Sequence, residues 1–141
     1  MSSLVVRYLR QPARRKRTLH AALAWLILSR IGLAFFALPT LQRWFSKNSK
    51  QSLADASLDE LRWAVLAAGR RVPRTKCLAR ALALQALMVR AGIPAQLCIG
   101  VAKESRGELE AHAWVLHAGE PVFDEPELAR YSVLSVFPAE A

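Results

Sequence analysis

The hydrophobic pattern of this sequence changes its period once, at Gly92-Ile93-Pro94. Upstream, apolar residues recur at helical spacing; downstream, they alternate with polar residues as in a half-buried strand. Helices that precede strands along a chain predict an α+β fold, and the short turns between the strands predict antiparallel neighbours. The expected helices span about 18–38, 40–48, 57–69 and 76–91, and the expected strands span 95–102, 111–117 and 121–124.

Local signals predict where several helices begin and end. Ser57 and Glu60 have the spacing of a capping box, in which each side chain bonds the backbone N–H of the other residue. Thr75 is the expected N-cap of the helix at 76–91, and Gly92 suits the left-handed position that follows a helix. Pro94 prevents that helix from continuing, so the change of period coincides with a helix end.

Basic residues are concentrated at one end of the chain. Ten of the 20 Lys and Arg residues lie within residues 1–54, which contain no Asp or Glu, and residues 55–141 carry all 11 acidic residues. We therefore divide the 141 residues into a basic, apolar helical arm at 1–54 and a folded domain at 55–141. A local excess of positive charge favours an acidic partner such as a peptide, a nucleic acid or an anionic lipid surface; a solvated basic surface is the alternative.

The arm contains an apolar helix, at about 19–38, that has no polar face. Such a helix is buried either in protein or in lipid. Arg30 interrupts it, and basic residues flank both of its ends, so no positive-inside bias supports a transmembrane orientation. The length of the stretch and its break at Arg30 and Gly32 also argue against a secretory signal. We expect docking against protein, with membrane association as the less favoured alternative.

Cys77 and Cys98 are too few for a disulfide framework and do not form a CxxC pair, so a reducing, cytoplasmic environment is the simpler interpretation. Cys77 lies at an expected helix start, where unpaired N–H groups and the helix dipole favour an anion, and Arg74 and Lys76 add positive charge. A thiolate placed there is a good nucleophile, and the same N–H groups can hold an oxyanion. A buried structural cysteine is the alternative, and we expect that role for Cys98.

A thiolate mechanism needs an imidazole and a group that orients it. His112 lies in the expected strand 111–117, and Asp124 ends the next one. If a three-residue loop, 117–119, joins these strands, His112 and Asp124 stand opposite each other on one face, close enough for a hydrogen bond. A two-residue loop would place them on opposite faces. His117, at the turn, is expected to be structural.

The run CLARALALQALMVRAGIPAQLCIGVA, followed by AHAWVLHAGEPVFD, resembles the transglutaminase-like cysteine proteases that mature lasso peptides. The specific elements are a Cys-Leu pair at a helix start, the AHAWV segment about 35 residues later and an Asp 12 residues after the His. The resemblance covers about 60–137. It implies a transglutaminase-like, papain-like α+β fold in which helices pack on a small antiparallel sheet. It also implies Cys77 as the nucleophile, His112 as the general base and Asp124 as the orienting acid.

This family cuts the leader from a ribosomally made precursor, so that an ATP-dependent cyclase can close the ring of the core peptide. Fused members of the family add a winged-helix leader-recognition domain, which needs strands, whereas residues 1–70 here are expected to be helical. The chain therefore resembles the stand-alone protease half of a split B protein, in which leader recognition belongs to a separate protein. The implied partners are the precursor peptide, a separate recognition protein and the cyclase; nucleic acid, metal ions and cofactors are not expected. The candidate partner-binding residues of the arm are Arg14, Arg15, Lys16 and Arg17.

Two alternatives to a leader-removing cysteine endopeptidase stay open on the residues alone. An amine can intercept the acyl-thioester that such a protease forms, so transglutaminase-like acyl transfer is one alternative. The other is a non-catalytic basic binding module in which Cys77 is a core residue. A thiol held far from the imidazole would favour the non-catalytic module, because proton transfer requires near hydrogen-bond reach.

Overall fold

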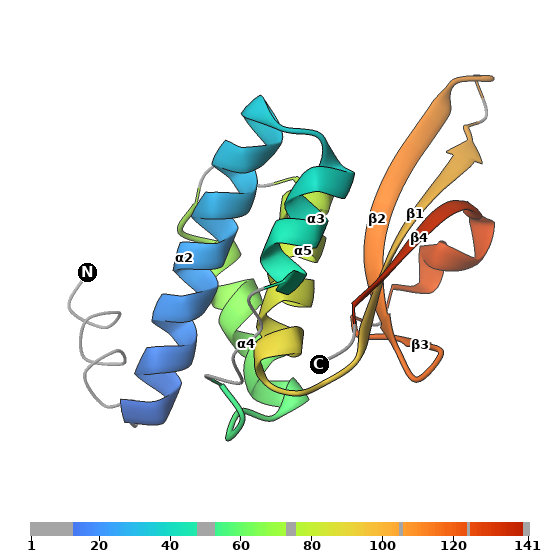
Figure 1. Ribbon diagram of the computed structural model, residues 1–141. Helices are drawn as coiled ribbons and strands as arrows, with labels where there is room; N and C mark the ends of the chain where they lie inside the picture. The colour runs from blue at the N-terminus through green and yellow to red at the C-terminus, as the bar shows by residue number, and fades with distance from the viewer. Residues whose placement is uncertain (1–12, 48–52, 73–75, 105, 124, 140–141) are drawn as a thin grey trace.

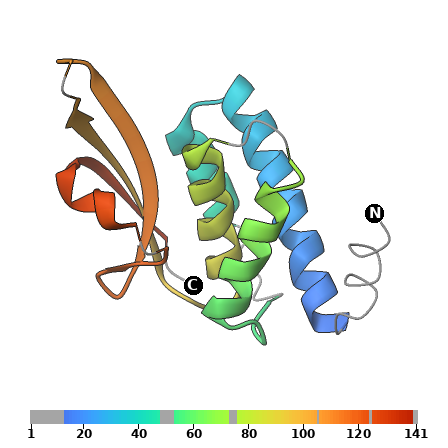
Figure 2. The ribbon, with the colours of Figure 1, turned by 180° about the vertical axis from the view of Figure 1, so that it is seen from behind.

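A computed structural model describes residues 13–47, 53–72, 76–104, 106–123 and 125–139. A layer of helices packs on one face of a four-stranded antiparallel sheet, which confirms the α+β class (Figures 1 and 2). The described helices are α2 (Ala13–Phe35), α3 (Leu38–Lys47), α4 (Leu58–Gly69), α5 (Cys77–Arg90) and a short 3₁₀ helix, η1 (Pro126–Arg130). The strands are β1 (Ala95–Lys103), β2 (Leu109–His117), β3 (Glu120–Pro121) and β4 (Ser132–Ala139).

The sheet has one strand more than the sequence predicted. Its order is β3-β2-β1-β4, so the chain crosses from one edge of the sheet to the other through η1. The third predicted strand is real but shorter, because β3 covers only Glu120–Pro121. β4 was missed because apolar residues on it do not alternate with polar ones: Val133, Leu134 and Val136 are all exposed on this edge strand.

Helix ends agree with the local signals in most places. The Ser57 side chain accepts a hydrogen bond from the backbone N–H of Glu60 at 3.2 Å, as a capping box requires. Gly92 follows α5 with a φ of 76°, the left-handed conformation expected of it. The N-cap of α5 is Lys76 and not the predicted Thr75, which lies outside the described residues.

The arm helix α2 contributes to the same core as the rest of the protein. It packs against α4 and α5, and its inward face is fully enclosed. The buried cluster combines Leu19, Ala22 and Leu26 of α2 with Leu61 and Val65 of α4, Leu84, Leu87 and Met88 of α5, and Leu97, Ala113 and Val115 of the sheet. Apolar burial is the main favourable term in folding, so α2 stabilises the helical layer directly.

A buried arginine joins three of the helices. The Arg90 guanidinium lies 3.9 Å from the ring centroid of Trp25 on α2 and donates hydrogen bonds to the carbonyl oxygens of Phe45 and Ala86. Burial lowers the pKa of Arg90 from its usual value. Gln85, also buried, donates to the carbonyl of Phe137 at 2.7 Å and so ties α5 to β4. Polar groups taken out of water are costly unless bonded, so these contacts fix the layers in one register.

The outer face of α2 is largely apolar in its second half, where Arg30 is the exposed charged residue. The segment Arg15–Phe35 is long and apolar enough to cross a membrane by length and composition, a property that core helices of soluble proteins share. Its outward side chains include Ile27, Leu28, Ile31 and Phe35, the last of which is 77% exposed. Apolar side chains exposed together mark an interaction site more often than single scattered ones do.

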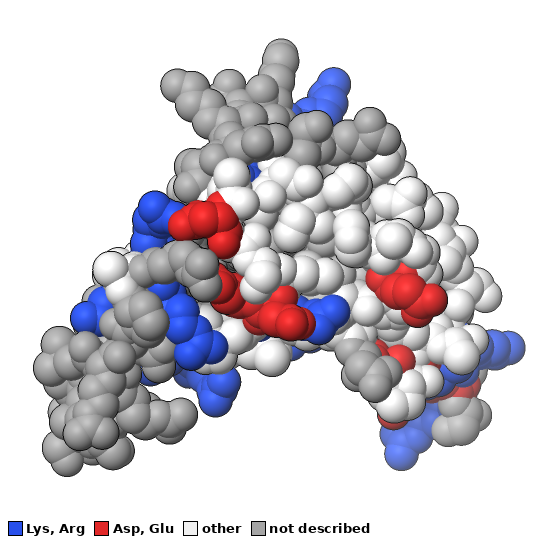
Figure 3. All heavy atoms as spheres, turned by 90° about the horizontal axis from the view of Figure 1, so that it is seen from below, with Lys and Arg blue, Asp and Glu red and all other residues white. Residues whose placement is uncertain are grey.

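Acidic and basic side chains alternate at the lower end of the molecule (Figure 3). Arg17 of α2 binds both carboxylate oxygens of Asp55, at 2.6 and 2.8 Å, and Arg62 binds Asp59 at 2.8 Å. Arg15 lies over the ring of Trp63, 4.3 Å from its centroid. The basic start of α2 is therefore used in part to hold this helix against α4.

Candidate active site

Cys77 is the first residue of α5, as the sequence predicted. Lys76, its N-cap, has an extended backbone and makes no capping hydrogen bond through its side chain. The backbone N–H groups of the first turn of α5 therefore receive no side-chain cap from Lys76, and Cys77 lies at this end of the helix. Cys77 is a free cysteine of intermediate exposure, packed beside the buried core.

A small cavity separates the start of α5 from β2. Its volume is about 10 Å³, no more than one water molecule needs. Its lining residues are Cys77, Arg80, Ala81 and Leu84 of α5, Ala113, Trp114 and Val115 of β2, and Phe123 and Glu125 beyond β3. Cys77 therefore lines a small, partly open hollow between α5 and β2.

His112 lies in the middle of β2, directly paired with Gly100 of β1. Its imidazole belongs to a cluster of three rings: the Trp114 centroid is 5.9 Å away at an interplanar angle of 25°, and the Tyr131 centroid is 5.3 Å away at 34°. The Trp114 and Tyr131 centroids are themselves 6.1 Å apart, so the three rings contact one another. Gly100 leaves room for Trp114, because a Cβ there would lie 2.7 Å from its ring. The orientation of the imidazole is thus restricted by its two aromatic neighbours.

The loop after β2 differs from the one predicted. His117 pairs with Glu120 and Leu116 with Pro121, so the loop has two residues, Ala118 and Gly119, and not three. Both adopt positive φ, 52° and 81°, as a type I′ hairpin turn requires. The predicted register, in which Asp124 stands opposite His112, is therefore wrong, and the position opposite His112 falls to residue 125. Asp124 itself lies outside the described residues.

Glu125 occupies that position and binds His112. Its Oε2 lies 2.6 Å from His112 Nε2, and the two side chains are only 27% and 18% exposed. Sequence reasoning missed Glu125 because it assumed a three-residue loop. A two-residue loop would have placed residue 125 opposite His112. None of the described hydrogen bonds joins His112 to Cys77. Glu125 lines the Cys77 cavity and is also hydrogen-bonded to His112.

Comparison with known families identifies the superfamily of this chain. A family model described as the transglutaminase-like superfamily matches residues 23–136, most of the chain. The chain belongs to the transglutaminase-like superfamily. No curated protein and no solved structure gives a significant match. Transglutaminase-like proteins are commonly cysteine proteases or acyltransferases, and an α+β fold with helices on an antiparallel sheet agrees with membership.

Within this transglutaminase-like domain, η1 is held against the outer face of β2. Arg130 binds Glu110 at 2.8 Å and contacts the Tyr131 hydroxyl at 3.3 Å. Hydrogen bonds from Tyr131 and then from Arg130 lower the pKa of Glu110. These contacts place Tyr131 on His112 and fix the end of the segment that carries Glu125.

Two other residues of the transglutaminase-like domain have the structural roles expected of them. Cys98 is 1% exposed in β1, and burial raises the pKa of its thiol, as is usual for a structural cysteine. His117 Nδ1–H donates to the carbonyl of Pro94 at 2.8 Å and joins the turn to the start of β1.

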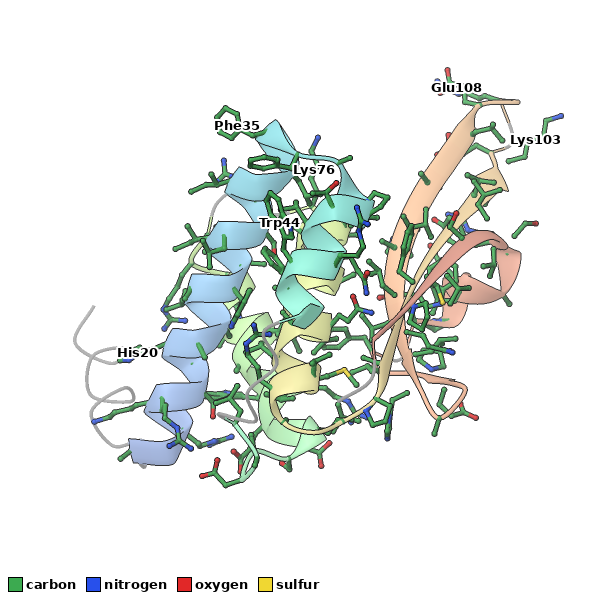
Figure 4. The ribbon with its side chains drawn as sticks, viewed as in Figure 1. His20, Phe35, Trp44, Lys76, Lys103 and Glu108 are labelled. Atoms are coloured by element: carbon green, nitrogen blue, oxygen red, sulfur yellow. The ribbon has the colours of Figure 1, made fainter. Side chains whose placement is uncertain are left out.

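The candidate partner-binding residues of the arm lie away from Cys77. Arg15 and Arg17 have the intramolecular contacts described above, Lys16 also has a partner within the protein, and nothing is described of the Arg14 side chain. The basic run begins α2 at the lower end of the helical layer, whereas Lys76 stands at the upper end (Figures 1 and 4). Their role in partner binding stays a prediction.

Gly100→Ala should damage both stability and activity. The new Cβ meets the Trp114 ring at 2.7 Å and the Ser132 carbonyl oxygen at 3.0 Å, and the backbone of neither strand can move freely. We expect a loss of about 1–3 kcal/mol in unfolding free energy and a slower reaction, because Trp114 must shift beside His112. Denaturant titration and a cleavage assay measure the two effects.

Gly69→Ala is the matched control for this substitution. Gly69 ends α4, and a Cβ there has no atom within 4 Å. The unfolding free energy of the Gly69→Ala variant should stay level or rise by at most about 1 kcal/mol, because Ala is the better helix former. If Gly100→Ala behaved like the control, the contact between Gly100 and Trp114 would have no importance for His112.

Proposed function

We propose that this protein is a cysteine endopeptidase that removes the leader peptide from a ribosomally made lasso peptide precursor. The observation that carries the proposal is the placement of Cys77 at the uncapped start of α5, in a cavity that it shares with the carboxylate partner of His112. Superfamily membership supports the chemistry, and the AHAWV segment with its spacing supports the substrate class.

The reaction follows the thioester route. The Cys77 thiol gives its proton to His112, and the sulfur attacks the scissile carbonyl carbon to form a C–S bond. N–H groups at the start of α5 hold the oxyanion. The C–N bond then breaks, and His112 returns the proton to the leaving amine. Water, activated by His112, hydrolyses the thioester and frees the leader carboxylate. The ring must approach the thiol for the first step, as catalytic hydrogen bonds often tighten only with substrate bound.

An exposed aromatic patch supports a partner that delivers the precursor. Phe35 and Trp44, 77% and 51% exposed, and Phe36, whose ring meets that of Trp44 at 5.1 Å, lie where α2 passes into α3. Figure 4 shows Phe35 and Trp44 at the same end of the helical layer as Lys76, the neighbour of Cys77. We propose that this aromatic patch receives the separate leader-recognition protein in the cytoplasm, and that the cyclase then uses the freed core peptide.

Changing Phe35 and Trp44 together to Ser should raise the apparent KM for the delivered precursor by about tenfold and leave kcat nearly unchanged. Exposed aromatic anchors contribute most to such contacts, and lost docking weakens uniform binding without touching the chemistry. Steady-state cleavage with the recognition protein present measures both constants. Leu134→Ser, an exposed apolar residue on β4, is the control and should change neither. Detergent dependence and liposome binding lost in the double variant, with cleavage intact, would indicate a membrane contact instead.

Leader release is the test of the function. The purified protein, a leader-bearing precursor and a recognition protein are mixed, and the products are analysed by mass. A free leader that has gained one water supports the endopeptidase. A leader joined to an added amine would identify an acyltransferase. An intact precursor with Cys77 unmodified would support the non-catalytic binding module.

A further inference from the structure

We propose that Glu125, in place of the predicted Asp124, is the residue that positions His112 for proton exchange with Cys77. The inference rests on the proposed function for its reaction but on contacts in the structure for its assignment. His112 Nε2 and Glu125 Oε2 are 2.6 Å apart, and both side chains are largely shielded from water. A charge-assisted hydrogen bond of this length in a shielded place is a strong one.

The backbone register fixes the assignment. The type I′ turn at Ala118 and Gly119 sets the pairing of β2 with β3. Beyond β3, the Val122 N–H still donates to the Val115 carbonyl at 2.9 Å. Val122 therefore lies opposite Val115, in the same register. Continued at this offset, residue 125 stands across from His112, which is where Glu125 is found.

The contact also selects the tautomer of His112. An ionised carboxylate only accepts hydrogen bonds, so in a neutral imidazole bound to it Nε2 carries the proton and Nδ1 is left as the acceptor. A general base needs such an acceptor nitrogen to take the proton of the thiol. Trp114 and Tyr131 hold the plane of the ring, and Glu125 also lines the cavity of Cys77. Nδ1 is therefore the nitrogen to which the proposal assigns proton exchange with Cys77.

Among the described residues, the other carboxylates near His112 are bound to Arg130, so they do not compete with Glu125 for the imidazole. Glu110, on the same face of β2, is bound to Arg130 at 2.8 Å, and Glu127 is bound to the same arginine at 3.5 Å. Tyr131 presents its ring to His112 while its hydroxyl is bonded to Glu110 and Arg130. On α5, Lys76 and Arg80 are cations and cannot accept from an imidazole N–H.

The experiment compares Glu125→Gln with Asp124→Asn, each nearly isosteric, and with Glu127→Gln as a control on η1. Glu125→Gln should lower kcat by about 100-fold or more with KM within a few-fold, because an amide also bonds the wrong tautomer. Glu125→Asp should recover part of that loss. Asp124→Asn should lose less than about tenfold, and Glu127→Gln should match the wild type. Thermal unfolding shows whether each variant is folded.

A second measurement does not need the peptide substrate. The rate of Cys77 alkylation by iodoacetamide in mildly acidic buffer reports a thiolate paired with imidazolium. Glu125→Gln should slow it at least tenfold, and Asp124→Asn should slow it little. If Asp124→Asn is equal to or worse than Glu125→Gln in both measurements, the proposal is overturned. If no leader is cut but alkylation depends on Glu125 as stated, the assignment stands and the substrate class is wrong.

Discussion

We expect Cys77→Ala to abolish leader release, with kcat reduced by at least about 10³-fold, to the level of the uncatalysed assay. In the proposed mechanism the Cys77 sulfur forms the acyl intermediate, and removing a nucleophile eliminates the whole two-step route. Cys77→Ser keeps the shape of the site but offers a hydroxyl, which is far less ionised than a thiol, and should be nearly as inactive. Mass analysis of the precursor after incubation measures the loss.

Cys98→Ala is the control for Cys77→Ala. Cys98 is buried within β1, so the Cys98→Ala variant should stay active while losing about 1 kcal/mol of stability. Circular dichroism of all three variants tests whether the Cys77 changes act on chemistry and not on folding. Cleavage by Cys77→Ala within a few-fold of the wild type would exclude the thioester mechanism.

His112→Ala should reduce kcat by about 10²- to 10⁴-fold, the usual contribution of a positioned general base. The thiol remains, but its proton has no acceptor and the leaving amine has no donor. His112→Gln keeps a side chain against Trp114 and Tyr131 and should be equally slow, which separates the loss of proton transfer from the loss of packing.

His117→Gln is the matched control for His112. His117 binds the Pro94 carbonyl at the turn and lies outside the Cys77 cavity, so its loss should change stability more than kcat. Initial rates at saturating precursor, with thermal unfolding of each variant, give the comparison. A His112→Ala enzyme that retains more than about a tenth of the wild-type rate would exclude His112 as the general base.

Local signals in the sequence were sufficient for the helices and for β1 and β2. Gly92 and Pro94 end α5 through backbone geometry that few other residues share, and the period-two pattern at 95–102 reflects one buried face. Cys77 was recognised as a helix start for the same reason, since the helical pattern begins there. These features depend on residues close together in the chain.

The turn after β2 could not be predicted because it uses an uncommon residue. A type I′ turn needs positive φ at both central positions, and Ala118 pays a steric cost there that Asn or Gly would avoid. The sequence therefore favoured a three-residue loop with Gly119 alone in the left-handed region. One residue of loop length was enough to move the predicted partner of His112 from Glu125 to Asp124.

Long-range contacts account for the other omissions. β4 joins β1 from a point more than 30 residues further along the chain, and its register shifts between Ile99 and Gly100, so no local alternation marks it. η1 is held by Arg130 and Glu110, which are 20 residues apart. Pairings of this kind are decided by tertiary context and not by local propensity.

The sharing of one core between α2 and the sheet-bearing part has a consequence for how such a protein is combined with other modules. Leu19, Ala22 and Leu26 fill space between α4 and α5, and Trp25 covers the charge of Arg90. A cut at residue 55 would leave an apolar trough and an uncovered guanidinium, so residues 55–141 are not a portable unit. Exchange of modules between proteins of this kind would have to keep α2 with the sheet-bearing part.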